Sequence, residues 1–184
     1  MKKIVTIFLL IFGMNSANAL TDISAGVYGG LNVPVVQEDT KSGSGLGLKA
    51  KFSPSPMIAA VAFFESRKFG NPEMTIFGQN MTLDGGKVTS YGAEVLLGNT
   101  GGNPGPHFYW ALGIFNYRWT RTGFEDLSKV GYHLGPGLEL IVPANIGIEI
   151  RGKFEIIPTD GGGSRKNALV YVGANYHFGL GGGM

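Results

Sequence analysis

The stretch Asn145–Ile157, NIGIEIRGKFEII, decides the fold because two kinds of side chain alternate along it. The apolar positions are Ile146, Ile148, Ile150, Phe154 and Ile156, and the charged positions between them are Glu149, Arg151, Lys153 and Glu155. A period of two is that of a β-strand with one apolar and one charged face. A soluble barrel turns such a charged face outward and a membrane barrel turns it inward, so the rest of the chain must decide the facing.

The first residues have the layout of a secretory signal peptide. Lys2 and Lys3 precede an apolar run from Ile4 to Met14, and Ala17-Asn18-Ala19 fits the small-x-small cleavage rule. We therefore predict a signal peptide over residues 1–19 and one β-barrel domain over residues 20–184. The expected location after export is the cell outer membrane.

The composition narrows the class of protein. Removing the signal peptide deletes two of the 15 basic residues and leaves 13 against 13 acidic ones, so the basic pI does not predict nucleic-acid binding. The absence of cysteine predicts a fold without disulfides. The longest apolar runs after the signal, MIAAVAFF (57–64) and FYWALGIF (108–115), are too short for a membrane-spanning helix. Apolar content spread over short runs is typical of membrane strands.

Eight segments alternate in polarity between turn-rich connections. They are Ile23–Val33, Gly45–Phe52, Met57–Lys68, Lys87–Gly98, His107–Trp119, Lys129–Val142, Ile146–Ile157 and Ala168–Phe178. The connections alternate between compact ones, at 53–56, 99–106 and 143–145, and mostly longer or more charged ones, at 34–44, 69–86, 120–128 and 158–167. Short turns at one rim and long loops at the other are typical of outer-membrane barrels. The predicted fold is all-β, an eight-stranded antiparallel up-and-down transmembrane β-barrel.

The distribution of glycine indicates which face points inward. Gly26, Gly47 and Gly137 are examples of the many glycines on the polar faces, whereas the apolar faces carry chiefly Gly29 and Gly152. Glycine weakens a strand, but in a narrow barrel it makes room for long side chains opposite. We therefore predict that the polar faces line the lumen and that ten charges pair there: Lys49, Lys51, Glu65, Arg67, Glu94, Glu139, Glu149, Arg151, Lys153 and Glu155.

The last segment, ALVYVGANYHF (168–178), ends in outward aromatic residues. Tyr176 and Phe178 resemble the insertion signal on the closing strand of bacterial outer-membrane barrels, although the six residues GLGGGM follow Phe178. With the export signal and the eight strands, the chain resembles the transmembrane domain of OmpA, OmpX and the opacity-type surface proteins. The resemblance implies contact with outer-membrane lipid and lipopolysaccharide and folding by the outer-membrane assembly machinery. We expect a monomer.

The facing of segment 107–119 stays open. Tyr109 and Trp119 share a phase and lie roughly 25 Å apart along a tilted strand, as residues of two interfacial girdles would. The opposite phase is equally apolar, with Phe108, Trp110, Leu112 and Ile114. A β-bulge that switches the facing partway is therefore an alternative.

Two rival functions are disfavoured by the pattern. The three histidines, His107, His133 and His177, have no serine nucleophile nearby in sequence, so we expect no enzyme, no metal site and no cofactor. A narrow or gated pore is an alternative, but ten balanced inward charges favour a filled interior.

A structural or surface-interaction protein is the favoured function. Its long loops would lie outside the cell, where Arg121, Lys129, Arg165 and Lys166 could meet the phosphates of lipopolysaccharide. A soluble periplasmic barrel that binds an apolar ligand is the remaining rival.

Overall fold

The computed structural model describes residues 22–35, 40–76, 79–160 and 162–178. The predicted signal peptide and the domain start at residue 20 lie outside these residues. The barrel strands are β1 (Asp22–Val35), β2 (Lys41–Ser55), β3 (Ile58–Gly70), β6 (Lys87–Gly98), β7 (Gly105–Thr120), β8 (Leu127–Val142), β9 (Ile146–Pro158) and β10 (Ser164–His177). A separate hairpin is formed by β4 (Glu73–Ile76) and β5 (Gln79–Thr82). In the described part of the chain, no helix has the length and apolarity needed to cross a membrane.

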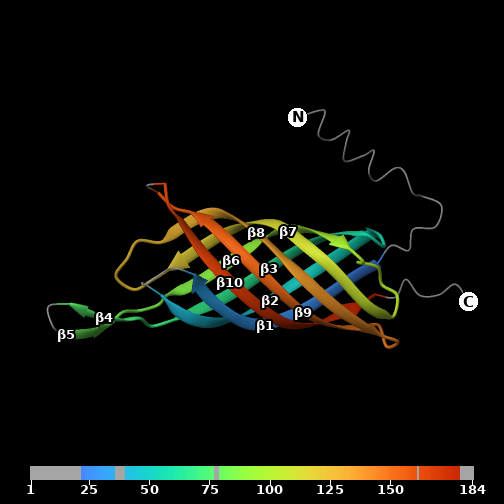
Figure 1. Ribbon diagram of the computed structural model, residues 1–184, viewed down its shortest axis with the longest axis horizontal. Helices are drawn as coiled ribbons and strands as arrows, with labels where there is room; N and C mark the ends of the chain where they lie inside the picture. Colours follow the sequence, from blue (N-terminus) through green and yellow to red (C-terminus); the bar gives the residue numbers. More distant parts are fainter. Residues whose placement is uncertain (1–21, 36–39, 77–78, 161, 179–184) are drawn as a thin grey trace, which may run out of the picture.

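The eight barrel strands close into one antiparallel sheet in the order β1-β10-β9-β8-β7-β6-β3-β2 (Figure 1). The closing pair, β1 and β10, runs from Ser24 opposite His177 to Val35 opposite Lys166. The backbone N–H of Phe178 extends this pairing by donating to the carbonyl of Ile23 at 2.8 Å. Each strand otherwise pairs with its neighbour along the chain, and the predicted eight-stranded up-and-down barrel is confirmed.

The strands at the long-loop rim extend further than the sequence predicts. β1 continues to Val35, β2 begins at Lys41 and β10 begins at Ser164, so parts of the predicted loops 34–44 and 158–167 are strand. The predicted loop 69–86 contains the β4–β5 hairpin, which projects beyond the barrel at the rim opposite the described chain ends (Figure 1). Its four-residue strands are too short to show an alternation in the sequence.

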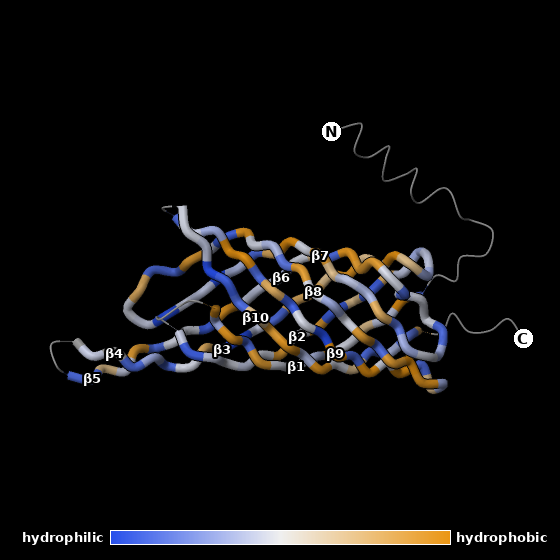
Figure 2. Tube along the Cα trace, in the orientation of Figure 1, coloured by the Kyte–Doolittle hydropathy of each residue, from blue (hydrophilic) through white to orange (hydrophobic). Residues whose placement is uncertain are grey.

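The two faces of each strand differ sharply in exposure. On β9, Ile148 and Ile150 are 52% and 55% exposed, whereas Glu149 and Arg151 are 4% and 6% exposed. Figure 2 shows the same alternation of hydrophobic and hydrophilic residues along the barrel strands. The exterior of the barrel is therefore apolar, and its interior holds the charges.

Apolar and charged side chains are unevenly distributed in the interior. The inward residues of β3, β6 and β7 are largely apolar and form two clusters: Phe63, Phe69, Val88, Phe115, Tyr117 and Trp119 with Ile157 of β9, and Ala59, Val61, Leu96, Tyr109 and Ala111. Seven of the ten predicted charges lie on β2, β8 and β9, and the other three, Glu65, Arg67 and Glu94, lie on β3 and β6. An inward wall that is apolar explains why both faces of segment 107–119 look alike in the sequence.

The structure corrects the expectation for β7. Tyr109 and Trp119 point inward and are 1% and 9% exposed, so they do not form outward girdles. Phe108 and Ile114 face outward, at 56% and 57% exposed. The pairing of β7 with β6 and β8 is continuous, so the alternative of a β-bulge is also wrong. The register irregularities lie instead between β2 and β3.

The inward glycines make room for aromatic rings as well as for charged side chains. Tyr109 lies between Gly98 of β6 and Gly137 of β8, directly opposite both. A Cβ added at Gly137 would lie 2.3 Å from Cζ of Tyr109, closer than any real contact. Among the charged side chains, Arg67 needs the space that a glycine leaves at position 45. A Cβ added at Gly45 would lie 2.5 Å from Cγ of Arg67.

Candidate functional site

The ten charged residues selected from the sequence all lie inside the barrel. Nine are buried, and 7% of the Lys49 side chain is exposed. They come from β2, β3, β6, β8 and β9, and the closed sheet arranges them at successive levels along the lumen.

A four-charge cluster occupies the lumen toward the long-loop rim. Arg67 contacts Glu155 at 2.8 Å and Glu65 at 3.3 Å. Lys153 contacts both Glu65 and Glu155 at 3.2 Å. Arg67 and Glu65 belong to β3, while Lys153 and Glu155 belong to β9, four places away in a ring of eight strands. The cluster therefore bridges the full width of the barrel.

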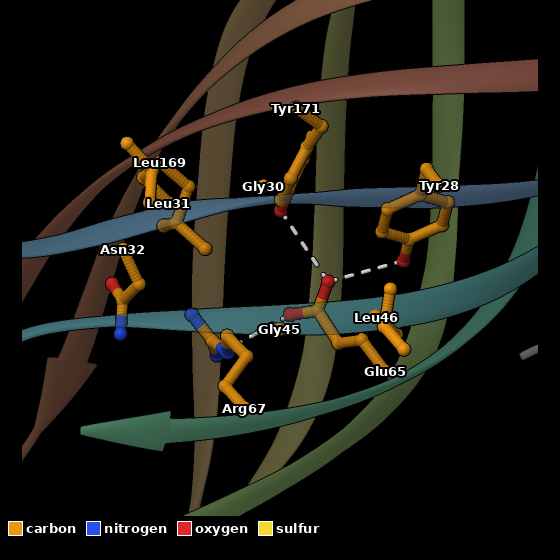
Figure 3. A pocket seen from close by; sticks show the side chains of 10 residues that line it. All are labelled: Tyr28, Gly30, Leu31, Asn32, Gly45, Leu46, Glu65, Arg67, Leu169 and Tyr171. Carbon is orange, nitrogen blue, oxygen red and sulfur yellow. Dashed lines mark hydrogen bonds and ion pairs between the residues drawn. The ribbon is translucent and has the colours of Figure 1, made fainter.

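Tyrosines complete the coordination of Glu65. The hydroxyls of Tyr28 and Tyr171 donate to its Oε2 at 3.1 and 3.3 Å (Figure 3). Arg67 donates in addition to the hydroxyl of Ser90 at 3.1 Å, and Asn167 donates to Glu155 at 3.3 Å. Neutral donors thus satisfy acceptor sites that the two cations leave open, as a buried charge requires.

Glu94, Arg151 and His133 form a second group. Both terminal nitrogens of Arg151 donate to the two carboxylate oxygens of Glu94, one of them at 2.6 Å. Nε2 of His133 lies 2.8 Å from Oε2 of the same carboxylate. The bidentate geometry fixes the orientation of the guanidinium as well as its distance.

A third group occupies the lumen toward the short-turn rim. Lys51 contacts Glu139 at 2.9 Å, and His177 lies between Glu139 and Asp22, at 3.1 and 2.9 Å. At the neighbouring Glu149, Lys49 and the hydroxyl of Tyr109 both donate to the carboxylate. All ten predicted charges therefore have a partner of opposite charge.

Several members of this network are absent from the sequence-based set, namely Asp22, Tyr28, Tyr109, His133, Tyr171 and His177. Each shares the inward phase of its strand, which the sequence shows for all of them except Tyr109 on β7. Their partners lie on other strands, and the sequence does not give the register between strands. His133 and Glu139, for example, share one face of β8 but bind Glu94 and His177 respectively.

Little space is left beside Glu65 and Arg67. A cavity beside Glu65 and Arg67, lined also by Tyr28, Asn32 and Tyr171, has a volume of about 10 Å³ (Figure 3). This is close to the minimum that holds one water molecule. Chemically, the network can hold the barrel wall together across the lumen and obstruct passage of solutes larger than water.

The basic residues predicted at the long-loop rim make contacts within the protein. Lys129 pairs with Asp160 at 2.5 Å. Arg121 lies 4.4 Å from the ring centroid of Phe124 and 5.5 Å from that of Trp119, and Arg165 lies 4.3 Å from that of Trp119. Lys166 likewise interacts within the protein.

Asp84, between β5 and β6, fixes two loops of the same rim to each other. Its Oδ2 accepts hydrogen bonds from the backbone N–H and the hydroxyl of Thr122, at 3.1 and 2.8 Å, and its Oδ1 accepts from the N–H of Gly86 at 3.0 Å. The bonds from Thr122 lower the pKa of Asp84 to about 2, because they stabilise the carboxylate form.

The last strand ends in two outward aromatic residues. Tyr176 and Phe178 are 51% and 53% exposed, and their rings meet edge to face with centroids 5.2 Å apart.

In the described residues, no group of three or more His, Asp or Glu side chains is placed to hold a metal ion.

Comparison with known proteins identifies the fold. No protein-family model matches the sequence, and neither does any curated protein sequence. Among solved structures, Neisserial surface protein A is 13% identical with a TM-score of 0.57, covering 87% of this chain and 98% of that one. OprG of Pseudomonas aeruginosa is 14% identical with a TM-score of 0.51, covering 87% and 96%. Ail of Yersinia pestis is 19% identical with a TM-score of 0.50, covering 86% and 97%. The fold is therefore that of the small eight-stranded outer-membrane barrels.

Proposed function

We propose that the protein is a bacterial outer-membrane β-barrel with a structural or surface-interaction role. The observation that carries the proposal is the inverted distribution of polarity, with exposed apolar residues outside and ion pairs inside. In water such an exterior would be a very large apolar patch. Thirteen-residue strands such as β9, tilted by about 45°, span roughly 30 Å, which matches the hydrocarbon core of a bilayer.

The filled lumen supports a non-conducting role over a pore. The pairs between β3 and β9 and between β2 and β8 each join strands on opposite sides of the ring. An ion that passes would have to separate buried pairs, at a cost of several kcal/mol each. The protein would therefore act through its exterior and its loops.

The environment of the histidines supports a non-enzymatic role. His133 is held by Glu94, His177 by Asp22 and Glu139, and His107 by Asn99 and the carbonyl of Asn103. Among the described residues, none of these histidines is hydrogen-bonded to a serine hydroxyl that it could activate.

The solved relatives fit a surface role. One is named a surface protein and another the attachment invasion locus protein. In this protein the projecting β4–β5 hairpin and the loop 121–126 would be the parts that meet partners outside the cell. We propose further that residues 1–19 direct export, that Tyr176 and Phe178 are read by the outer-membrane assembly machinery, and that the barrel is a monomer in contact with lipopolysaccharide.

Fractionation of cells that express the full chain tests this proposal. We expect the protein in the detergent-soluble outer-membrane fraction, with a gel mobility that changes on boiling. Release by osmotic shock as a soluble protein would refute the membrane role. In planar bilayers we expect no steady single-channel steps, and regular salt-dependent steps would support the pore instead.

A further inference from the structure

The outer surface of the neighbouring strands β9, β10, β1, β2 and β3 carries a groove that the structural role does not require. Its apolar part has a volume of about 830 Å³ and is lined by Val27, Leu48, Phe64, Ile148 and Val172, among others. It continues toward the long-loop rim as a second hollow of about 630 Å³, which shares Gly29, Leu46 and Ser66 with the first. The two hollows form one track up the side of the barrel.

Gly29 lies on the floor of this track. It is one of two glycines that the sequence places on outward faces, and it pairs with Val172 on one side and Leu46 on the other. A Cβ added at Gly29 would lie 2.9 Å from Cδ2 of Leu46, so the track is narrow at this level. Outward glycine gives the barrel interior no room. Glycine within a strand marks a bulge, a bend or a close approach by a ligand or another backbone, and the pairing of β1 at Gly29 is continuous, without a bulge.

Two lysines lie at the end of the track nearest the long-loop rim. Lys68 of β3 and Lys87 of β6 are exposed, share the outward face and lie directly opposite each other. Like charges in directly opposite positions destabilise a sheet. Neither lysine has an ion pair within 4 Å among the described residues, so an anion placed between them would relieve this repulsion.

The carboxylates near the lysines are already engaged. Asp84 and Asp126 line the same rim pocket as Lys68 and Lys87. Asp84 accepts hydrogen bonds from Thr122 and Gly86 and influences Lys68 only beyond ion-pair distance, while Asp126 pairs with Arg118 at 2.9 Å. The lysine pair therefore offers positive charge to an external ligand in this pocket, which Arg121 also lines.

We infer that this track binds one molecule of lipid A, the phosphorylated and acylated glycolipid that anchors lipopolysaccharide. A phosphate would lie between Lys68 and Lys87, and one acyl chain would lie in the apolar track across Gly29. Ser44 and Ser66, on the β2–β3 surface between these two parts, offer hydroxyls to the sugar. The inference rests on the proposed outer-membrane location, which the fractionation above tests separately.

Native mass spectrometry of the detergent-purified barrel, titrated with lipid A and separately with phosphatidylglycerol, tests the inference. We expect one lipid A to bind more tightly than phosphatidylglycerol. K68Q/K87Q should weaken lipid A binding by more than about tenfold, because it removes two lysines and each contributes roughly fivefold near an anionic lipid headgroup. G29V should weaken it as well, because the added side chain would obstruct the track.

Matched variants control for general effects of charge and of strand substitution. K41Q/K129Q removes two rim lysines that already pair with Glu73 and Asp160, and G152V alters the other outward glycine, whose added Cβ would only touch Pro136 at 3.7 Å. Both should bind lipid A as the wild type does. A gel mobility that changes on boiling identifies the folded fraction of each variant. If G29V does not fold, the binding of lipid A by K68Q/K87Q alone tests the inference.

Equal binding by wild type and K68Q/K87Q would overturn the inference, and so would equal affinity for phosphatidylglycerol. A dimer that forms through this face without lipid would also overturn it in favour of a second copy of the chain. A wild-type barrel that fractionates with the outer membrane but gives one of these results refutes the lipid site alone.

Discussion

The two faces of β9 share a backbone but meet different surroundings. Outward Ile148 and Ile150 lie beside the apolar side chains of β8 and β10, and inward Arg151 and Lys153 reach carboxylates on β6 and β3. The outward positions require only an apolar side chain, so one apolar residue can replace another there. The inward face needs particular partners at particular levels. The exterior is therefore specified by composition and the lumen by geometry.

Removal of one member of a lumen pair should have the largest effect. E94Q leaves the buried guanidinium of Arg151 without its bidentate partner, so we expect a loss of about 3–5 kcal/mol in the free energy of unfolding, measured by urea titration in lipid vesicles. The double variant E94Q/R151M should recover most of this loss, because it removes both charges. A single variant as stable as the wild type would mean that geometry does not specify the lumen.

A charge placed on the outward face should cost somewhat less and should depend on depth. I150R puts an arginine near the middle of β9, where we expect a loss of about 2–4 kcal/mol in the same urea titration. I146R, at the end of the strand beside the 143–145 turn, should cost only about 0–1 kcal/mol. Equal losses at both positions would contradict a hydrocarbon environment around the barrel.

A methyl group should be tolerated at outward Gly152 and not at inward Gly137. G137A brings a Cβ to 2.3 Å from the Tyr109 ring, so we expect a loss of about 1–3 kcal/mol from overpacking. At Gly152 the nearest atom is 3.7 Å away, so G152A should be neutral or slightly stabilising. Comparison of the two unfolding midpoints makes the measurement, and a reversed order would invalidate the assigned facing.

The smallest effect is expected in the loops, where the charges are solvated. The pKa of Asp84 is lowered from 3.8 to about 2, so its contribution to loop stability is complete above about pH 4 and is lost as the pH falls toward 2. We expect the amide resonance of Thr122 to shift across this window in NMR spectra and D84N to abolish the shift. A midpoint near 4 would mean that the Asp84–Thr122 contact does not form.

The sequence predicts the outward face better than the lumen. Alternation within one strand assigns each side chain to a face. The eight barrel strands and the inward position of the ten charges can therefore be predicted from the sequence. Alternation does not give the register between strands, so the links from His133 to Glu94 and from Lys153 to Glu65 are not readable. On β7 the inward wall is itself apolar, and alternation then carries no information about the facing of Tyr109 and Trp119.

In the proposed orientation, lipid surrounds the isoleucine-bearing faces while the charged faces enclose the lumen. Single-tryptophan variants test it most directly, because W110F/W119F removes both native tryptophans. Into this background I114W and F115W place a tryptophan at nearly the same depth on β7, one outward and one inward. In bilayers of brominated lipid we predict strong quenching of fluorescence for I114W and little for F115W. Equal quenching of the two, or stronger quenching of F115W, would contradict the account.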